Sequence, residues 1–599
     1  MLSKQQEKEV SKITWDLSDL YDSLESPDLK KGLEKAEQDA TKIQDRYKGK
    51  IKSLDAADLL KVYQAIESVW ELYSRASQYI HLRYAIETDN DPIKSWVDTC
   101  DQVGTAIGNA LVFFELEIGA VPKATYTTWR QSPVLENYHY SLEHSHKTAR
   151  YNLSEKEEQL SALKNLTGID AFQKLYEEFT SSFAYQFKIN GKEETLTGDS
   201  LRALRTHKDK EVRRRAMKTF YKKYEENQLI FTHIYNNILK SKSQEKTSRG
   251  YKSTINIKNI HNDLSDEVIE LLHDVTKSSY PLVQRYYTLK KRIINCPDMT
   301  LADIYAPMPQ TDQTYAYSEA KDIVLDGFNR FDSEIYDMAK AMFDENRIHA
   351  PVLPKKRGGA FCSGAIPSIK PYVMLNYLGR PRDIATIAHE LGHAIHDMLA
   401  AKQTLTNFHP ILPLAETASV FAEMLVTDKL LADTQDPLTK QSILSEKIED
   451  IFATSHRQNI FSTFEMATHQ KAETQLLTTN DLCETYQSQL KDMFGNVVKQ
   501  PEEYKWEWST IPHIFESPFY VYSYNFGNLF VMALYQQYLE EGTAFIPKYK
   551  ALLSEGSAQS PEDIMKIMGC DPKDPVFWNK SITYISSLID RLEESLESA

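Results

Sequence analysis

Apolar residues recur at helical spacing along most of this chain, and the alternating pattern of a strand appears in only two places. The clearest helical run covers residues 57–87, where apolar side chains return every three or four positions. Glycine is scarce, with 20 among 599 residues, and long stretches are rich in helix-forming Glu, Lys, Leu, Ala and Gln. The sequence therefore predicts a mostly α-helical fold.

The two strand signals differ in kind. Apolar residues alternate from 183 to 189, and Asn190-Gly191 then supplies the residues of a type I′ hairpin turn. The second signal lies in residues 359–377 and ends in the run Tyr-Val-Met-Leu-Asn-Tyr at 372–377. We expect one hairpin and one small sheet among the helices.

The length of the chain exceeds what one compact core usually holds, so more than one domain is expected. The clearest division is a helical N-terminal region, residues 1–200, followed by a larger helical region, residues 201–599, that carries the chemistry described below.

Charge and composition limit the partners. The formal net charge is −15, and an acidic surface repels phosphate backbones, so we expect no nucleic acid partner. The basic cluster at 213–215 is interpreted as a solvated helix face. Five scattered cysteines favour a reducing compartment. Neither a signal peptide nor a membrane span is apparent, so a cytoplasmic protein without a membrane partner is expected.

One short segment carries recognisable chemistry, namely His389-Glu390-Leu-Gly-His393. In a helix, residues i and i+4 lie on one face, so His389 and His393 can reach one metal ion. Glu390 lies beside them and can reach a metal-bound water. Zinc lowers the pKa of such a water to about 7, and a carboxylate can accept its proton. Asp383 is expected to cap this helix.

A catalytic zinc needs a third protein ligand and one open position. The segment after the motif offers two carboxylates, Glu416 and Glu423, on nearly the same helix face. One can bind the metal, and the other can support a ligand or form a surface ion pair. His409 is a further alternative. His396 is interpreted as a packing residue or a neighbour of a ligand.

The motifs together resemble a known family. HELGHAIH at 389–396 followed by LAETASVFAE at 414–423 resembles the oligoendopeptidase F branch of the thimet-oligopeptidase family of zinc metallopeptidases. Segments at 15–21, 303–307 and 358–364 also look like family segments in family order, as does PHIFESPFYVYSYNFG at 512–527. The resemblance covers essentially the full length.

The resemblance implies a mostly α-helical, two-lobed ellipsoid with a deep central channel, roofed by residues 1–200, and a small β-sheet beside the zinc helix. It implies one Zn²⁺ per chain, bound by His389, His393 and Glu416. The run at 372–377 would be an edge strand that pairs with the extended substrate. The implied enzyme is a zinc metalloendopeptidase that hydrolyses internal bonds of short, unstructured oligopeptides through a zinc-bound water activated by Glu390.

A second group of candidate catalytic residues lies near residue 520. His513 and nearby tyrosines offer hydrogen-bond donors, and donors aimed at the oxyanion of peptide hydrolysis stabilise it strongly. We expect His513, Tyr520 and Tyr524 to fill this role, and which of Tyr520, Tyr522 and Tyr524 contacts the oxyanion stays open.

Other functions remain to be weighed. A carboxydipeptidase needs a cation for the terminal carboxylate, and Lys355, Lys356, Arg357 or Arg380 can supply one. An aminopeptidase needs an acidic cluster that no motif near the zinc helix provides. A non-catalytic peptide-binding protein would not require the ligands and base that are present.

Overall fold

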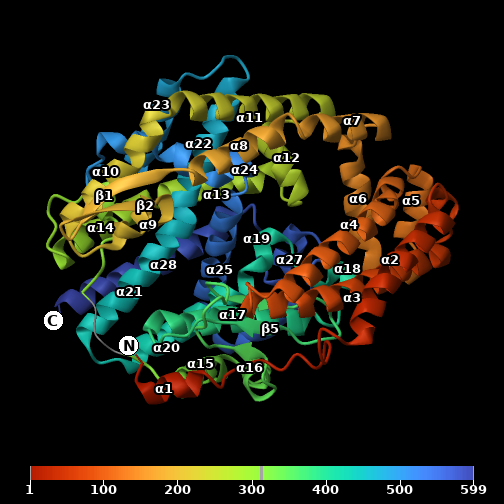
Figure 1. The fold of residues 1–599 in the computed structure, drawn as a ribbon, viewed down its shortest axis with the longest axis horizontal. Coiled ribbons are helices and arrows are strands. Elements are labelled where there is room, and N and C mark those ends of the chain that lie inside the picture. The colour runs from red at the N-terminus through yellow and green to blue at the C-terminus, as the bar shows by residue number, and fades with distance from the viewer. Residues whose placement is uncertain (1, 310–313, 598–599) are drawn as a thin grey trace. The chain divides into compact units, whose positions relative to one another are not determined.

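The computed structural model of the chain describes residues 2–309 and 314–597. Helices make up most of the fold, with two small sheets (Figure 1), which confirms the mostly α-helical prediction. The chain divides into two compact units, each assembled from three separate segments. Unit 1 comprises Met1–Arg150, Asp312–Asp433 and Gln537–Asp571, and unit 2 comprises Tyr151–Thr311, Thr434–Gln536 and Pro572–Ala599.

Unit 1 contains the predicted metal motif and one of the sheets. Its helices are α1 (Lys4–Val10), α2 (Pro27–Tyr47), α3 (Ala56–Ile86), α4 (Asp91–Gly119), α5 (Lys123–Arg130), α6 (His139–Thr148), α15 (Tyr317–Phe331), α16 (Ser333–Asp344), α17 (Pro381–Ala400), α18 (Leu405–Phe408), α19 (Leu412–Ala415), α20 (Thr417–Asp433), α26 (Phe545–Leu553) and α27 (Pro561–Ile567). Its strands are β3 (Ile348–His349), β4 (Phe361–Ser363) and β5 (Tyr372–Met374).

Unit 2 contains the predicted hairpin, and α25 (Tyr522–Glu541) runs from it into unit 1. Its other elements are α7 (Glu155–Asn165), α8 (Ile169–Ser181), β1 (Ala184–Ile189), β2 (Lys192–Thr197), α9 (Gly198–Ala203), α10 (Lys210–Glu226), α11 (Gln228–Arg249), α12 (Thr254–His261), α13 (Asp266–Ser278), α14 (Tyr280–Ile293), α21 (Pro437–Ile451), α22 (Arg457–Ala472), α23 (Thr479–Phe494), α24 (Pro512–Glu516) and α28 (Pro575–Glu597).

The hairpin forms as predicted. β1 pairs antiparallel with β2, and Ile189 lies opposite Lys192 across a two-residue turn. Asn190 and Gly191 both have positive φ, at 50° and 81°, as a type I′ turn requires.

The small sheet of unit 1 has the order β3-β5-β4, so β5 is its central strand. The expectation that the run at 372–377 forms an edge strand was therefore wrong. β3 pairs parallel with β5 on one side, and β4 pairs antiparallel on the other. Residues 13–16 run beside β3, with hydrogen bonds from Ala350 N to Ile13 O at 2.9 Å and from Asp16 N to Asn346 O at 2.7 Å. The outer strand on the remaining side is β4.

The N-terminal helices build a core against this sheet. Tyr372 and Met374 of β5 are fully buried in an apolar cluster with Tyr79 and Ile80 of α3 and with Trp15. Burial of apolar area is the main stabilising contribution here, at about 25 cal/mol per Å². The first 150 residues and the predicted metal motif thus belong to one unit, while the predicted boundary near residue 200 stays a prediction.

The basic cluster on α10 is only partly what the sequence suggested. Arg213 is buried and donates to Asp303, which is completely buried, from Nη2 at 2.7 Å. Arg214 binds the other oxygen of Asp303 at 2.8 Å. A buried charge needs a partner, and this partner lies ninety residues further along the chain, where helical periodicity could not reveal it.

Among the described residues, no single helix has both the length and the apolar composition needed to cross a membrane, whereas the bent pair α4 and α5 meets the two criteria together.

Candidate metal centre

Helix α17 carries the metal motif and begins at Pro381. Asp383 is not its N-cap, as was expected, but lies in the first turn. Its Oδ2 accepts hydrogen bonds from the backbone N–H groups of Arg380, at 3.0 Å, and Leu378, at 2.8 Å. These bonds satisfy donors before the first turn and place a negative charge at the positive end of the helix. The start of the motif helix is therefore firmly anchored.

Three predicted ligands meet in one place. His389 and His393 lie one turn apart on α17, and Glu416 lies between α19 and α20. The two Nε2 atoms are 3.2 Å apart, and Glu416 Oε2 lies 3.4 Å from His389 Nε2 and 3.3 Å from His393 Nε2. These three donor atoms form a nearly equilateral triangle, and within the described part of the chain this is the group of His, Cys, Asp and Glu side chains that could hold a metal ion.

The size of this triangle fits zinc. A tetrahedral Zn²⁺ with nitrogen and oxygen ligands at about 2.0–2.1 Å has neighbouring ligand atoms about 3.3–3.4 Å apart. The observed separations of 3.2–3.4 Å agree with that value. Three donors on one face also leave the fourth tetrahedral position to a non-protein group, as in catalytic zinc sites.

Glu423 has a different place from Glu416. Its Oε1 lies 2.5 Å from Nδ1 of His389, on the side of the ring away from the triangle. Such a carboxylate holds the proton on Nδ1, so that Nε2 keeps its lone pair for a metal. Burial alone would lower the pKa of His389, but the Glu423 hydrogen bond and the nearby carboxylates raise it to about 9. The surrounding carboxylates thus favour a positive charge at His389, carried either by a proton on Nε2 or by a metal cation in its place.

Ser419 supports Glu416, the third predicted ligand. Its hydroxyl donates to Glu416 Oε2 at 2.7 Å and to the Glu416 carbonyl oxygen at 3.1 Å. Ser419 is fully buried. Its position three residues after Glu416 places it one helical turn away. Sequence reasoning did not single out Ser419, although this spacing was available.

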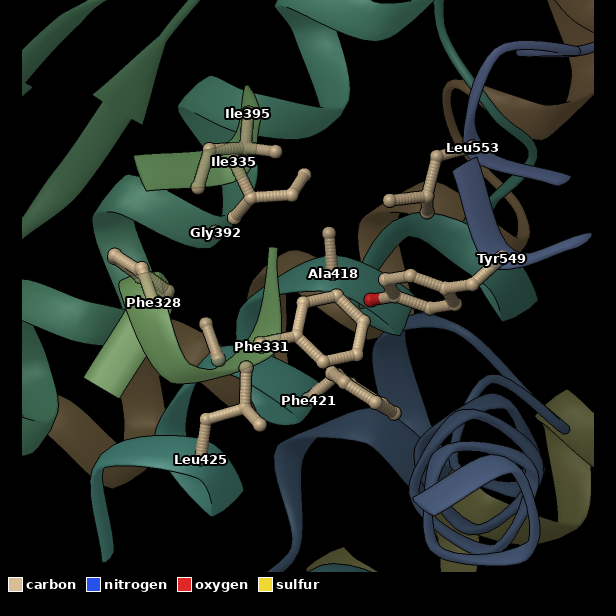
Figure 2. Close-up of a pocket in the computed structure, with 11 residues that line it drawn as sticks. Phe328, Phe331, Ile335, Gly392, Ile395, Ala418, Phe421, Leu425, Tyr549 and Leu553 are labelled. Carbon is tan, nitrogen blue, oxygen red and sulfur yellow. The ribbon is translucent and has the colours of Figure 1, made fainter. Parts of the chain in front are cut away.

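Close packing of α17 against α20 brings the three predicted ligands together. A Cβ atom at Gly392 would lie 2.5 Å from the carbonyl oxygen of Ala418 and 2.6 Å from Cα of Ser419. Only glycine allows this approach. Beside the crossing lies an apolar pocket, and Gly392, Ala418 and Phe421 are among the residues that line it (Figure 2). Tyr549 stacks on Phe421 at 4.4 Å between ring centroids.

Glu390 points toward the sheet of unit 1. It is 6% exposed, and burial raises the pKa of its carboxyl above the ordinary value. The backbone of Cys362 in β4 lies close to this carboxyl and acts to lower its pKa, against the larger effect of burial. Cys362 lies opposite Val373, whose N–H donates to Arg347 on the β3 side, so the backbone groups of Cys362 turn away from β5. The outer side of β4 therefore faces Glu390.

Two histidines near the motif, His396 and His409, do not join the triangle. His396 is buried, and burial lowers its pKa to about 3, so it is a neutral packing residue. His409 is exposed and contacts the ring of Phe408 at 4.6 Å between centroids. Neither belongs to the group that could hold a metal.

The second predicted group lies in unit 2. The ring of His513 stacks on Tyr520 with centroids 5.5 Å apart, and the Tyr524 hydroxyl lies 3.3 Å from His513 Nε2. Burial lowers the pKa of His513, with Glu516 acting in the opposite direction, so the ring is neutral at pH 7. Tyr522 turns elsewhere, because it is fully buried and its hydroxyl accepts a hydrogen bond from Asn262 at 2.8 Å.

Comparison with known protein families gives two adjoining matches. Residues 203–584 match the sequence model described as Peptidase family M3. Residues 117–185 match the one described as Oligopeptidase F.

Curated relatives extend over nearly the whole chain. Oligopeptidase PepF of Bacillus subtilis is 27% identical over 92% of this chain and 83% of its own length. An oligoendopeptidase F homolog of Lactococcus lactis is 23% identical over 100% of this chain and 99% of its own length.

Solved structures share the fold. A chain from Chlamydophila abortus has a TM-score of 0.87 at 22% identity and covers 97% of this chain, with 98% of its own length matched. Oligoendopeptidase-F from Enterococcus faecium has a TM-score of 0.71 at 22% identity, covering 95% of this chain and 99% of that one.

Proposed function

Because this chain belongs to peptidase family M3, we propose that it is a zinc-dependent endopeptidase that hydrolyses internal peptide bonds of short, unstructured oligopeptides. The observation that carries the proposal is the triangle formed by His389 Nε2, His393 Nε2 and Glu416 Oε2, whose sides of 3.2–3.4 Å suit one tetrahedral zinc ion. A bound Zn²⁺ would polarise the scissile carbonyl and lower the pKa of a water molecule.

Glu390 is the proposed general base. It accepts a proton from the attacking water and passes that proton to the amine that leaves. A base works best when its pKa lies near the working pH, and burial raises the pKa of Glu390 in that direction. His513, Tyr520 and Tyr524 are the proposed donors to the oxyanion of the substrate.

β4 is the proposed strand for substrate binding, in place of the run at 372–377. An extended peptide can add to the outer side of a sheet through main-chain hydrogen bonds. The backbone groups of Cys362 turn away from β5, on the side where Glu390 lies. A peptide on this side would bring its carbonyl groups near the base.

Two of the basic residues considered for a carboxydipeptidase, Lys355 and Lys356, have contacts that do not favour that role. Lys356 Nζ already donates to the carbonyl oxygen of Pro351 at 2.6 Å and lies 3.0 Å from His349 Nδ1. Lys355 has a side chain 66% exposed, with Asp89 at 4.0 Å. These contacts favour a structural role for Lys356 and a solvated one for Lys355.

The proposal is tested by metal content and cleavage of a fluorogenic peptide blocked at both ends. We expect one zinc per chain and internal cleavage. Glu416→Ala should lose metal and activity together, because it removes a ligand. Glu390→Gln should keep the metal and lose turnover. Glu423→Gln is the matched comparison and should weaken metal binding by about 10–100-fold without abolishing it.

Stoichiometric zinc in Glu416→Ala would contradict the ligand assignment. Cleavage only of peptides with a free terminus would contradict the endopeptidase assignment and favour an exopeptidase.

A further inference from the structure

Phe519 has an unusual backbone conformation. Its φ is 62°, in the left-handed region, which a bulky non-glycine residue adopts only when its surroundings impose it. Asn190 and Asn346 share this conformation, but asparagine tolerates it more readily. Phe519 directly precedes Tyr520, so the direction in which Tyr520 leaves the backbone depends on this conformation.

Phe519 lies between α24 and α25, and a buried carboxyl of helix α22 holds its backbone. Glu465 of α22 is fully buried, and its Oε1 accepts a hydrogen bond from the Phe519 N–H at 2.7 Å. His469, one turn later on α22, is also buried, and its ring contacts that of Phe519 at 4.7 Å between centroids. Backbone and ring of Phe519 are therefore both fixed by the same helix.

This arrangement is costly for the core of unit 2. In the part of the chain that the structure describes, Glu465 Oε2 and both ring nitrogens of His469 are buried without a hydrogen-bond partner. Buried polar atoms without partners lower stability, and an apolar pair would pack at less cost. A costly polar pair beside a strained residue is typical of a functional site.

The tyrosines that depend on Phe519 are those of the proposed oxyanion group. Tyr520 stacks on His513, Tyr524 lies 3.3 Å from His513 Nε2, and the two tyrosine rings are 5.3 Å apart. We propose that Glu465 is a positioning residue of the peptidase reaction, which holds the Phe519 amide and so fixes Tyr520 and Tyr524 around His513. This inference rests on the proposed function.

The test compares two substitutions at one position. Burial raises the pKa of Glu465 to about 8, so its carboxyl is mostly neutral at pH 7, and Glu465→Gln keeps both an acceptor and a donor. Glu465→Met has a similar length but no acceptor. Because misplacement of a reacting group by about 1 Å can cost on the order of 10² in rate, we expect a loss of kcat of that order in Glu465→Met. KM and zinc content should stay near the wild-type values, and Glu465→Gln should restore most of the turnover.

Ser462→Ala is the matched control on α22. Ser462 is also fully buried, and its hydroxyl lies 2.8 Å from Nε2 of His273 in α13. This variant should lose thermal stability and keep kcat. If Glu465→Met does not fold, Glu465→Asp, which is too short to reach the Phe519 amide, replaces it. Normal kcat in the folded variant would overturn the inference.

A double substitution separates this inference from the proposed function. In a Tyr520→Phe, Tyr524→Phe background, Glu465→Met should cause little further loss, because its effect passes through the two hydroxyl groups. A full additional loss would overturn the positioning role. If the tyrosine variants keep normal turnover, the proposed role of the tyrosines at the oxyanion is wrong. If the tyrosine variants lose turnover but Glu465→Met keeps normal turnover, only the positioning role of Glu465 is wrong.

Discussion

Three tyrosines between residues 520 and 524 differ in what their hydroxyl groups contact. Tyr524 lies 3.3 Å from His513 Nε2, and the ring of Tyr520 stacks on that histidine. Tyr522 is instead buried against Asn262. Substrate therefore has no access to the Tyr522 hydroxyl, while Tyr520 and Tyr524 share the surroundings of the neutral His513.

This difference yields a prediction for turnover. Tyr520→Phe or Tyr524→Phe should lower kcat by about 10²–10³ with little change in KM, because a donor to the oxyanion acts mainly in the transition state. Tyr522→Phe, the control, should lower thermal stability and keep kcat. Steady-state kinetics on one blocked peptide checks all three, and equal kcat in all three variants would contradict the assignment.

The burial of Glu465 leads to a second prediction, which concerns how the stability of the folded protein depends on pH. Its pKa is about 8 when folded and about 4.3 in an unfolded chain. Between these values unfolding releases a proton, so rising pH destabilises the folded protein. Glu465→Gln lacks this proton. Its melting temperature relative to wild type should thus rise between pH 5 and pH 8, and should change little below pH 4.

Some site residues were predictable from the sequence and others were not. The spacing of His389 and His393 needs only helical geometry, and Glu416 followed from a family resemblance. The roles of Glu423 and Glu465 depend on which atoms they approach, which is a property of packing. A glutamate in a helix looks the same in the sequence whether it binds solvent or a buried amide.

At the scale of elements, the crossing of α17 and α20 determines the geometry of the candidate metal centre. Gly392 lies at the contact, and Ala418 and Ser419 lie across from it. The proposed ligands lie on both sides of this crossing, with His389 and His393 on α17 and Glu416 just before α20. Any separation of the two helices would enlarge the triangle beyond the reach of one ion.

Gly392→Ala should therefore weaken metal binding and lower stability, because its Cβ would overlap backbone atoms that cannot turn aside. Gly108→Ala is the control, since Gly108 lies within α4 and its Cβ would meet nothing within 4 Å. That variant should be neutral or stabilised by up to about 1 kcal/mol. Zinc titration and thermal unfolding of both variants check this, and normal zinc affinity in Gly392→Ala would show that the crossing can relax.

The sheet shows why some elements escaped prediction. The hairpin was predictable because its two strands and turn are contiguous. β5 was found, but its central position was not, because β3 has only two residues and its pairing partners in β5 lie 25 positions further along the sequence. Strand order is set by distant pairing, which local alternation does not encode.

At the scale of the whole molecule, the proposed pairing with β4 restricts which substrates can bind. A peptide that adds to a strand must offer its own N–H and C=O groups, and in a folded protein these are already bonded. A folded substrate must unfold first, and a stability of 5–10 kcal/mol leaves a fraction of only about 10⁻⁴ or less unfolded.

We therefore expect a disulfide-stabilised small protein to resist cleavage and its reduced, unfolded form to be cut at least about 10³ times faster. Mass spectrometry of both forms under the same conditions provides the measurement. A short linear peptide with the same cleavage site is the control for local sequence. Equal rates for the two forms would contradict strand addition as the binding mode.

The interleaving of the two units was not visible in the sequence, because helical composition is uniform along the chain. Each unit is assembled from three segments, and the amino-acid composition does not change where one segment ends and the next begins. The segments of unit 1 are far apart in the sequence and meet through tertiary contacts, such as the hydrogen bond from the Tyr549 hydroxyl to the Thr417 carbonyl oxygen, at 3.4 Å.

That contact has a consequence for how the protein is made on the ribosome. Tyr549 of α26 stacks on Phe421 of α20, but it is translated 132 residues after Thr417. At a translation rate of roughly 5–20 residues per second, α26 is synthesised on the order of ten seconds after the start of α20. During that interval the apolar side of α20 that later packs against Tyr549 is uncovered, so a chaperone that shields apolar surfaces should contact the growing chain there. A stalled nascent chain that ends before α26 should bind zinc more weakly than the finished protein.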